Sequence, residues 1–496
     1  MNMSVDFLRI SIPEPRCREW TRPELGRGLM HICGACFCLL LSFAASAVSA
    51  QEPQPTPPPY KINRQDEDWT MMRDPSRRSD WSDKLKYIPL GEHEGWYVSV
   101  GGEARPYYER YRNEEWGSAP QDLSGYWLQR FLLHGDFHFG KRVRFFGQLQ
   151  SGLEAGKRGG PAPPDEDKLD VLQAFVDVAW NSNPERSLTL RAGRQELNYG
   201  SGRLISIRDG TNVRQTFDGA KLMLRAGDWN VDGFVVKPVE NDRGFFDDAP
   251  ISSETLWGIY AARPLPHQIP IGKIDIYYIG LARRSAQFDQ GTARETRHTV
   301  GTRLSGVSGG SDYNAEFIRQ FGGFGSGDLN AWAVGVEYGY TLRRMPLSPR
   351  PGFKANVTSG DRDPNDSDLG TFHPLFPKGA YFGQLASIGP LNHRDLHPTL
   401  DLTFPHGVSL TLDWVFYWRQ SLRDGVYSVP GDLLRTGQLS AARFIGHQPD
   451  FEVRWQANRH ATFFLNYGRF FVGRFLRETP PGENTTFFAA WLTCQF

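Results

Sequence analysis

Basic side chains are concentrated in residues 188–225, where seven Arg and Lys accompany only three acidic residues. A guanidinium group presents a planar fork of donors that fits both oxygens of a carboxylate. A local excess of such groups on a low-dielectric wall would attract a polyanion and repel cations. The alternative is that these residues pair with acids and only stiffen the protein, and for any single Arg the sequence leaves both readings open. The basic residues are Arg191, Arg194, Arg203, Arg208, Arg214, Lys221 and Arg225.

A second polar stretch, residues 359–379, is rich in Asp and then alternates Pro with aromatic residues. Asp361, Asp363 and Asn365 have the spacing of the first three ligands of a calcium-binding loop. The sixth and twelfth positions hold Asp and Phe instead of Gly and Glu, which excludes an EF-hand. A looser calcium site in an external loop stays open, but we favour a folded polar loop in which Arg362 is held by its acidic neighbours.

Motifs for catalysis are weak in this chain. The segment GVSGG at 306–310 fits the nucleophile-elbow pattern, but no helix follows it, and the stretch is typical of a turn between two strands. The twelve His are scattered without metal-ligand spacing, and there is no phosphate-binding glycine loop. We therefore expect no enzymatic activity and no cofactor.

The overall charge also limits the function. The 56 Lys and Arg balance 56 Asp and Glu, so attraction for a charged partner must be local, and we expect no nucleic-acid partner. Four of the five Cys lie before residue 50, and Cys494 alone in the rest of the chain cannot form an internal disulfide.

The elements that must position these side chains are strands. From Trp96 onward, runs of about ten residues with alternating polarity are separated by Gly, Pro, Asn and Asp clusters. In residues 126–139 the alternation places Arg130 on the polar face with two His and one Asp, and in residues 143–152 it places Arg144 there. We expect both Arg to line the substrate path. We predict an all-β transmembrane antiparallel β-barrel of 16 to 18 strands, with a lumen wide enough for an aqueous path instead of a side-chain core.

The last strand supports a membrane barrel over a soluble one. Residues 486–496 alternate in polarity and end on the aromatic Phe496. Bacterial barrels end in this way because the last strand closes on the first and is read by the barrel assembly machinery. We therefore expect the bacterial outer membrane as the location, with outer-membrane lipid around the barrel.

The N-terminal part has a different composition. Residues 32–48 are the only sustained apolar run, and Arg22 and Arg27 precede it. We predict that residues 1–50 are an N-terminal extension and signal peptide cut after Ala50, and that residues 51–94 are a periplasmic lead-in or short plug. Residues 95–496 are then the barrel.

From about Trp96 the chain resembles the alginate export family of outer-membrane barrels. The resemblance lies in the segments RAGRQEL, GSGRLISIRDGTNVRQTFDG, NVTSGDRDPNDSDLGTFHPLFPKGAYFG, DWVFYWRQSLRDGVY and WLTCQF. It implies a barrel of about eighteen strands whose electropositive lumen conducts a polyuronate out of the periplasm.

The resemblance also implies roles for single residues. Arg194 and Gln195 match the GRQ block and Arg362 matches the Arg of GDRD, so these three are expected to face the pore. The match around the other candidates is to the wider family, and we expect them to line the constriction. These other candidates are Arg203, Arg208, Asn212 and Arg214.

The expected function is export of an anionic polysaccharide or oligosaccharide through an Arg-lined lumen by passive diffusion. The main alternative is a general or uptake porin for small organic anions, and an outer-membrane enzyme is less favoured. Periplasmic export components are possible partners. The sequence leaves open which sugar or anion passes, in which direction, and in which oligomeric state.

Overall fold

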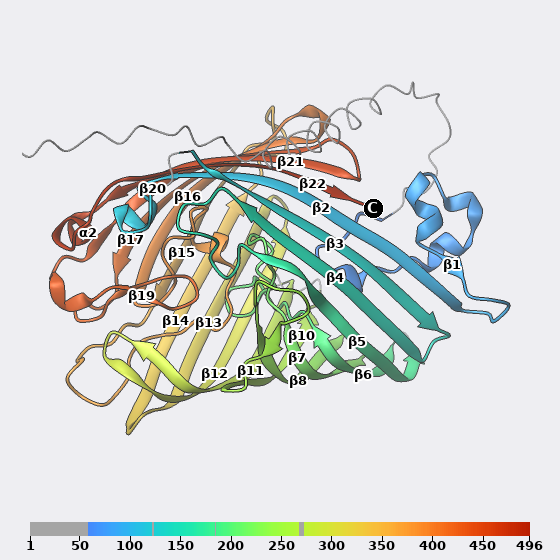
Figure 1. Cartoon of the computed structure of the whole chain (residues 1–496), viewed down its shortest axis with the longest axis horizontal. Helices are drawn as coiled ribbons and strands as arrows, with labels where there is room; N and C mark the ends of the chain where they lie inside the picture. Colours follow the sequence, from blue (N-terminus) through green and yellow to red (C-terminus); the bar gives the residue numbers. More distant parts are fainter. Residues whose placement is uncertain (1–57, 122–123, 184, 267–271) are drawn as a thin grey trace, which may run out of the picture. The chain divides into compact units, whose positions relative to one another are not determined.

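The structure is a computed structural model that describes residues 58–121, 124–183, 185–266 and 272–496. The predicted signal peptide and its cleavage site after Ala50 lie outside the described residues. Barrel strands begin at Trp96 and end at Gln495 (Figure 1).

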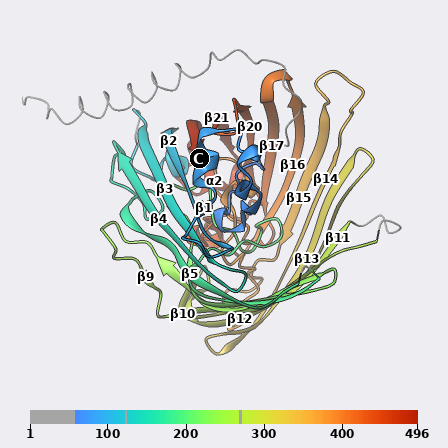
Figure 2. The ribbon, with the colours of Figure 1, turned by 90° about the vertical axis from the view of Figure 1, so that its right-hand side faces the viewer.

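Eighteen strands form one closed antiparallel barrel, which confirms the predicted fold class at the upper end of the expected strand number. Each strand pairs with the next barrel strand along the chain, and Figure 2 shows them arranged around a common interior. The barrel strands are β2 (Trp96–Arg112), β3 (Tyr126–Phe139), β4 (Val143–Ala155), β5 (Asp167–Asn183), β6 (Arg186–Gln195), β7 (Phe217–Ala226), β8 (Trp229–Glu240), β10 (Glu254–Pro264), β11 (Lys273–Phe288), β12 (Gly291–Ser308), β13 (Ser311–Phe324), β14 (Gly327–Tyr340), β15 (Arg350–Thr358), β16 (His393–Thr403), β17 (Val408–Arg419), β20 (Phe444–Gln456), β21 (Ala461–Val472) and β22 (Thr485–Gln495).

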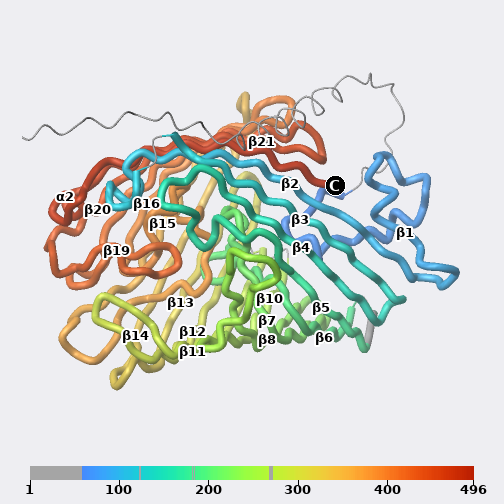
Figure 3. Tube along the Cα trace, in the orientation of Figure 1, coloured from blue at the N-terminus to red at the C-terminus, as the bar shows by residue number. Residues whose placement is uncertain are grey.

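The barrel closes where the last strand meets the first. β22 pairs with β2, with Gln495 opposite Glu103 and Thr486 opposite Arg112. The main chain of Phe496 continues this pairing: its N–H donates to Gly102 O at 3.1 Å, and its carbonyl accepts from Gly102 N–H at 3.0 Å. The two strands, one blue and one red, lie side by side in Figures 1 and 3.

The strands are apolar outside and polar inside, as their period of two predicts. In β3 the side chains of Trp127, Phe131 and Leu133 are exposed, whereas those of Arg130 and His134 are buried. A soluble protein would bury the aromatic face and expose the charges. The reverse arrangement matches a barrel wall that has hydrocarbon on its outer side.

The connections differ strongly in length between the two ends of the barrel. Two residues join β12 to β13, whereas residues 359–392 join β15 to β16. Residue 496 and the β1 strand (Ile88–Pro89), which pairs with the start of β2, lie at the end with the short turns. Outer-membrane barrels have short periplasmic turns and long external loops, which assigns this end to the periplasm.

Two long connections fold into the barrel and pack on its wall. Ile205 and Phe376 form a parallel bridge, in which Ser206 N–H donates to Phe376 O at 2.9 Å and Phe376 N–H donates to Leu204 O at 2.8 Å. The interior therefore differs from the expected aqueous lumen without a core, because the apolar side chains of these loops need an apolar part of the wall to cover them. Wall residues in this buried cluster include Phe234, Leu256, Ile279 and Ile318.

The first described residues form short turns against the barrel, shown in blue in Figure 2. Arg64 Nη2 donates to Phe496 O at 2.8 Å, and Lys86 Nζ donates to Val100 O at 2.9 Å. Trp69 and Met72 pack in a small buried cluster with Tyr87 and Tyr97. These contacts hold the segment at the end of the barrel that carries the short turns. The 3₁₀ turns of this segment are η1 (Arg64–Asp66), η2 (Thr70–Arg73), η3 (Pro75–Arg77) and η4 (Trp81–Leu85).

The remaining elements are small and lie in the connections. In the described part of the chain, no helix has the length and apolar character needed to cross a membrane. The elements are η5 (Glu114–Gly117), β9 (Ala249–Pro250), η6 (Gly379–Phe382), η7 (Pro405–Gly407), β18 (Val426–Tyr427), β19 (Leu433–Arg435), η8 (Gly437–Leu439) and α2 (Arg474–Glu478).

Deletion of Phe496 should reduce barrel formation, because it removes two main-chain hydrogen bonds to Gly102 and the acceptor of Arg64. Phe496→Ala keeps the main chain and is the matched control. We expect a several-fold lower folded fraction for the deletion in lipid vesicles, measured by heat-modifiable gel migration, and a smaller loss for Phe496→Ala. Equal folding of wild type and deletion would contradict a closing role for the terminal residue.

Candidate functional site

The connection between β6 and β7, residues 196–216, carries four of the candidate residues into the barrel. Asn212 fastens this loop, because its Nδ2 group donates to the main-chain oxygens of Gln129, Leu153 and Asp165 at 3.3, 3.2 and 2.8 Å. These oxygens belong to β3, β4 and the connection after β4. Asn212 thus fixes the path of the loop along the wall.

Arg130 and Arg214 are joined through a carboxylate of this loop. Arg130 Nη2 lies 2.6 Å from Glu103 Oε1 and 2.8 Å from Asp209 Oδ1. Arg214 Nε and Nη2 donate to Asp209 Oδ1 at 2.9 and 2.5 Å, and its Nη1 lies 3.3 Å from Glu196 Oε1. Both guanidinium side chains are only 1% exposed. These two residues match the alternative raised from the sequence, in which Arg pairs with acids across the interior.

The two carboxyl groups of the loop respond differently to this environment. Burial raises the pKa of Asp209, but Arg214, Arg130 and Arg105 outweigh burial and hold the pKa well below its usual value. Burial dominates for Glu196, and Arg214 offsets it only in part, so the pKa of Glu196 is raised to about 7. Near neutral pH, Asp209 is therefore fully charged and Glu196 only in part.

Arg105 belongs to the same cluster and was not among the sequence candidates. Its Nη1 and Nη2 donate to the main-chain oxygens of Asp209 and Thr211 at 2.7 and 2.6 Å, and no acidic oxygen of a described residue forms an ion pair with it. Alternation along β2 puts Arg105 on the same face as Glu103. This alternation is the sequence pattern that could have identified Arg105 as an inward-facing residue. Three guanidinium groups thus share the carboxylates of Glu103 and Asp209 and the partly ionised Glu196, so bases slightly exceed ionised acids in this cluster.

Arg194 and Gln195 stabilise the base of the loop. Arg194 Nε and Nη2 donate to both oxygens of Asp218 on β7 at 2.9 and 3.1 Å. Its Nη1 also lies 3.4 Å from Asp170 on β5. Gln195 is buried and donates to the main-chain oxygens of Gly193 and Gly219 at 3.4 and 3.3 Å.

Arg203 joins the loop to the opposite wall. Its guanidinium forms a hydrogen-bonded ion pair with Glu316 on β13, lies 3.7 Å from Glu337 on β14, and donates to the Tyr381 hydroxyl. Since Tyr381 belongs to the other inward connection, Arg203 helps to fix both loops inside the barrel.

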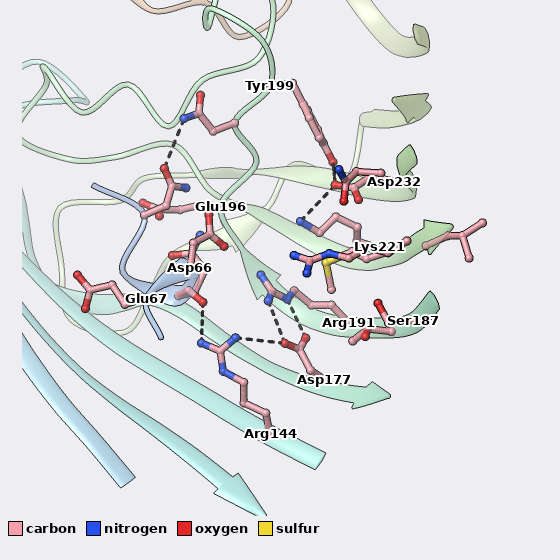
Figure 4. A pocket seen from close by; sticks show the side chains of 18 of the residues that line it. Asp66, Glu67, Arg144, Asp177, Ser187, Arg191, Glu196, Tyr199, Lys221 and Asp232 are labelled. Carbon is pink, nitrogen blue, oxygen red and sulfur yellow. Dashed lines mark hydrogen bonds and ion pairs between the residues drawn. The ribbon is translucent and has the colours of Figure 1, made fainter. Parts of the chain in front are cut away.

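A cavity of about 620 Å³ lies between the first described residues and the wall formed by β4 to β8 (Figure 4). Arg144 and Arg191 both point at Asp177 there, with Arg191 Nε 2.8 Å and Arg144 Nη1 3.5 Å from its oxygens. Arg144 also donates to Gln65 O at 2.7 Å, which ties the wall to the N-terminal segment. The charged lining residues are Lys61, Asp66, Glu67, Arg144, Asp177, Arg191, Glu196, Lys221, Arg225 and Asp232.

Arg208 differs from the other candidates on this loop. Its side chain forms no ion pair or hydrogen bond with any described residue, and its guanidinium carbon lies 5.8 Å from the ring centre of Phe376. The main-chain φ of Arg208 is +53°, a conformation that is uncommon for a residue with a side chain. Burial lowers the pKa of Arg208 to about 10, so the group stays charged at neutral pH.

Arg362 lies exposed on the long β15–β16 connection, and it forms no ion pair with the described residues. Arg423 pairs with Asp363 instead, at 3.5 Å, so the interpretation that acidic neighbours hold Arg362 is wrong. Asp361 accepts a main-chain hydrogen bond at 2.9 Å, and Asp363 accepts from the amide of Asn365. Asp361 and Asp363, which the sequence suggested as calcium ligands, thus accept hydrogen bonds that shape the loop.

Replacement of Arg214 should destabilise the barrel. Arg214→Met leaves Glu196 without its basic partner and Asp209 with one fewer, and loss of one member of a buried pair costs about 3 kcal/mol. Arg225→Met is the matched control, because Arg225 is an exposed base of the same region and should change stability by less than about 0.5 kcal/mol. Urea unfolding of the barrel in vesicles, followed by tryptophan fluorescence, measures both. Equal stability of the two variants would contradict the structural role of the cluster.

Solved structures with a similar fold include outer-membrane barrels of Pseudomonas aeruginosa. OccK3 (OpdO) is 14% identical, with a TM-score of 0.53 over 80% of this chain and 95% of that chain. OccK2 (OpdF), solved in complex with glucuronate, is 12% identical, with a TM-score of 0.54 over 80% and 98%. OpdK, solved with vanillate, is 11% identical, with a TM-score of 0.52 over 80% and 98%. At these identities the likeness shows the barrel fold alone.

Sequence comparison gives a more specific result. No curated protein matches the chain in sequence. The profile of the family described as "Alginate export" matches residues 96–490, which is nearly the whole barrel. The chain therefore belongs to the alginate export family, whose members are outer-membrane barrels of bacteria.

Proposed function

We propose that this outer-membrane channel exports an anionic polysaccharide, an alginate-like polyuronate, by passive diffusion. Family membership and the barrel fold support a channel. The proposal assigns the basic residues of the interior to the path of the carboxylates. Periplasmic export components would deliver the chain, and the N-terminal segment that holds Arg64 and Lys86 would act as a short plug at the entrance.

The unpaired guanidinium of Arg208 is the observation that carries this proposal. It is the member of the loop whose charge no described side chain neutralises by direct contact. Asp432 acts on Arg208 without forming an ion pair with it, and it raises the pKa of Arg208 by less than burial lowers it. A carboxylate that reaches this place would meet a free fork of donors without first displacing an acidic partner.

The paired residues of the cavity support conduction in a different way. Arg144 and Arg191 share Asp177, and Lys221 lies 3.8 Å from Asp232. A sugar carboxylate could take the place of one protein carboxylate for a short time and then be released. A path made of several such weak sites allows movement, whereas one strong site would hold the polymer.

Uptake of small organic anions remains the second candidate function. The OccK2 and OpdK structures, which share the fold, contain glucuronate and vanillate respectively. Each of these ligands is a small molecule with one carboxylate group. The likeness of this chain to the two proteins does not extend beyond the fold. The two functions differ in what they predict for polymer and monomer.

Replacement of Arg208 should lower anion selectivity without unfolding the barrel. We expect Arg208→Gln to reduce the anion-to-cation permeability ratio several-fold, because it removes an unneutralised charge from the interior. Arg343→Gln, an exposed Arg in the β14–β15 connection, is the control and should leave the ratio unchanged. The measurement is the single-channel reversal potential across a salt gradient.

The same recordings with added uronates separate the two functions. A polysaccharide channel should be blocked by an oligouronate at concentrations where monomeric glucuronate has little effect, and Arg208→Gln should weaken the block. Equal effects of monomer and oligomer would favour the small-anion porin. An unchanged reversal potential in Arg208→Gln would contradict the assignment of this residue.

A further inference from the structure

Three carboxylates converge near the end of the barrel that carries the long connections. Asp167 and Asp170 lie at the start of β5, and Asp248 lies just before β9. One oxygen from each of them lies within 4.8 Å of the other two. None of these residues belongs to the cluster around Arg214 or to the cavity described above.

The main chain brings these residues together. Leu169 and Phe245 form a parallel bridge, and Phe246 N–H donates to Leu169 O at 2.9 Å. Asp248 N–H donates to Asp170 Oδ2 at 3.0 Å. The connection from β8 to β10 is thus fixed against β5, with the three carboxylates placed between them.

The described basic residues do not balance the negative charge of this group. Asp167 and Asp248 form no ion pair with any described base. Asp170 has only Arg194 at 3.4 Å, and both remaining donors of that guanidinium are engaged with Asp218. Burial and the charge of Asp170 contribute to a pKa of Asp248 raised to about 6. Three close carboxylates that share a fraction of one cation repel each other strongly.

Asp167 also has an unsatisfied oxygen. Its side chain is fully buried, at 0% exposure, and its Oδ1 atom has no hydrogen-bond partner among the described residues. Its Oδ2 atom accepts only a long bond of 3.3 Å from Gln150 Nε2. A buried carboxylate oxygen without a donor is unfavourable in a native protein, and a bound cation in contact with this group would satisfy it.

We propose that Asp167, Asp170 and Asp248 bind a calcium ion. Carboxylate oxygens are hard ligands, and Ca²⁺ accepts six to eight of them in flexible geometry. Mg²⁺ requires nearly ideal octahedral geometry and retains several waters, so a group of three carboxylates, two of which are buried, suits it less. The ion joins the β8–β10 connection to β5 and leaves Arg194 to Asp218. The site adjoins the proposed substrate path at Arg194, which lies 3.4 Å from Asp170.

The test is direct binding of Ca²⁺ to the full barrel in detergent after EDTA treatment. Isothermal titration with CaCl₂ should show one saturable site in the wild type. Asp167→Asn and Asp248→Asn should each weaken it by roughly tenfold or more, because affinity depends on ligand charge. Asp363→Asn removes the same charge from the other Asp-rich loop and should bind Ca²⁺ as the wild type does. Asp248→Asn, which is less buried, keeps the test valid if Asp167→Asn does not fold.

A second readout is the temperature at which the barrel loses its compact gel migration. Ca²⁺ should raise this temperature in the wild type and in Asp363→Asn but not in Asp167→Asn or Asp248→Asn. Absence of binding in the wild type would overturn the site, as would loss of binding in Asp363→Asn with retention in Asp167→Asn and Asp248→Asn. Equally tight binding of Mg²⁺ would overturn the choice of Ca²⁺.

Discussion

The structure depends on one constraint: every main-chain amide that lies in hydrocarbon needs a hydrogen-bond partner within the protein. Lipid offers no hydrogen bonds, so a sheet that crosses the membrane must close on itself. Pairing of β22 with β2 achieves this, and the main chain of Phe496 extends the pairing to Gly102. Closure also sets the polarity of the wall: because the outer face meets lipid, the side chains that alternate with Phe131 and Leu133 must all point to one interior.

An interior built in this way contains many charges in a space partly shielded from water. Isolated buried charges are too costly to persist, so they pair. Arg130 and Arg214 around Asp209 show the result, and so does Arg203 with Glu316. The same pairs fix the inward loops to the wall, so that electrostatic pairing and the position of the loops are one structural feature.

The sequence predicts the features that repeat along a strand and misses those that depend on contacts between distant loops. The inward orientation of Arg130 follows from the period of two in β3, and the closing role of the last strand follows from its own pattern. In contrast, Asp209, which binds Arg130, lies 79 residues further along the chain in a loop whose path no local pattern specifies. The apolar packing of Ile205 against the wall was missed for the same reason, since a loop residue has no periodicity to reveal its face. The unpaired state of Arg208 could be recognised only after its neighbours were found to be paired.

If the channel carries a polyanion as proposed, exposure decides which of the paired arginines can exchange partners with its carboxylates. Arg130 and Arg214 are 1% exposed, and removal of their acids would leave a buried charge behind, so these two serve the frame of the channel. Arg194 and Arg144 are 13% and 17% exposed, so under the proposed function these are the paired arginines that a sugar carboxylate would reach more easily. An electropositive path therefore does not require an excess of basic residues over the whole chain. Under the proposed function it requires a few guanidinium groups that are free or weakly paired, such as Arg208.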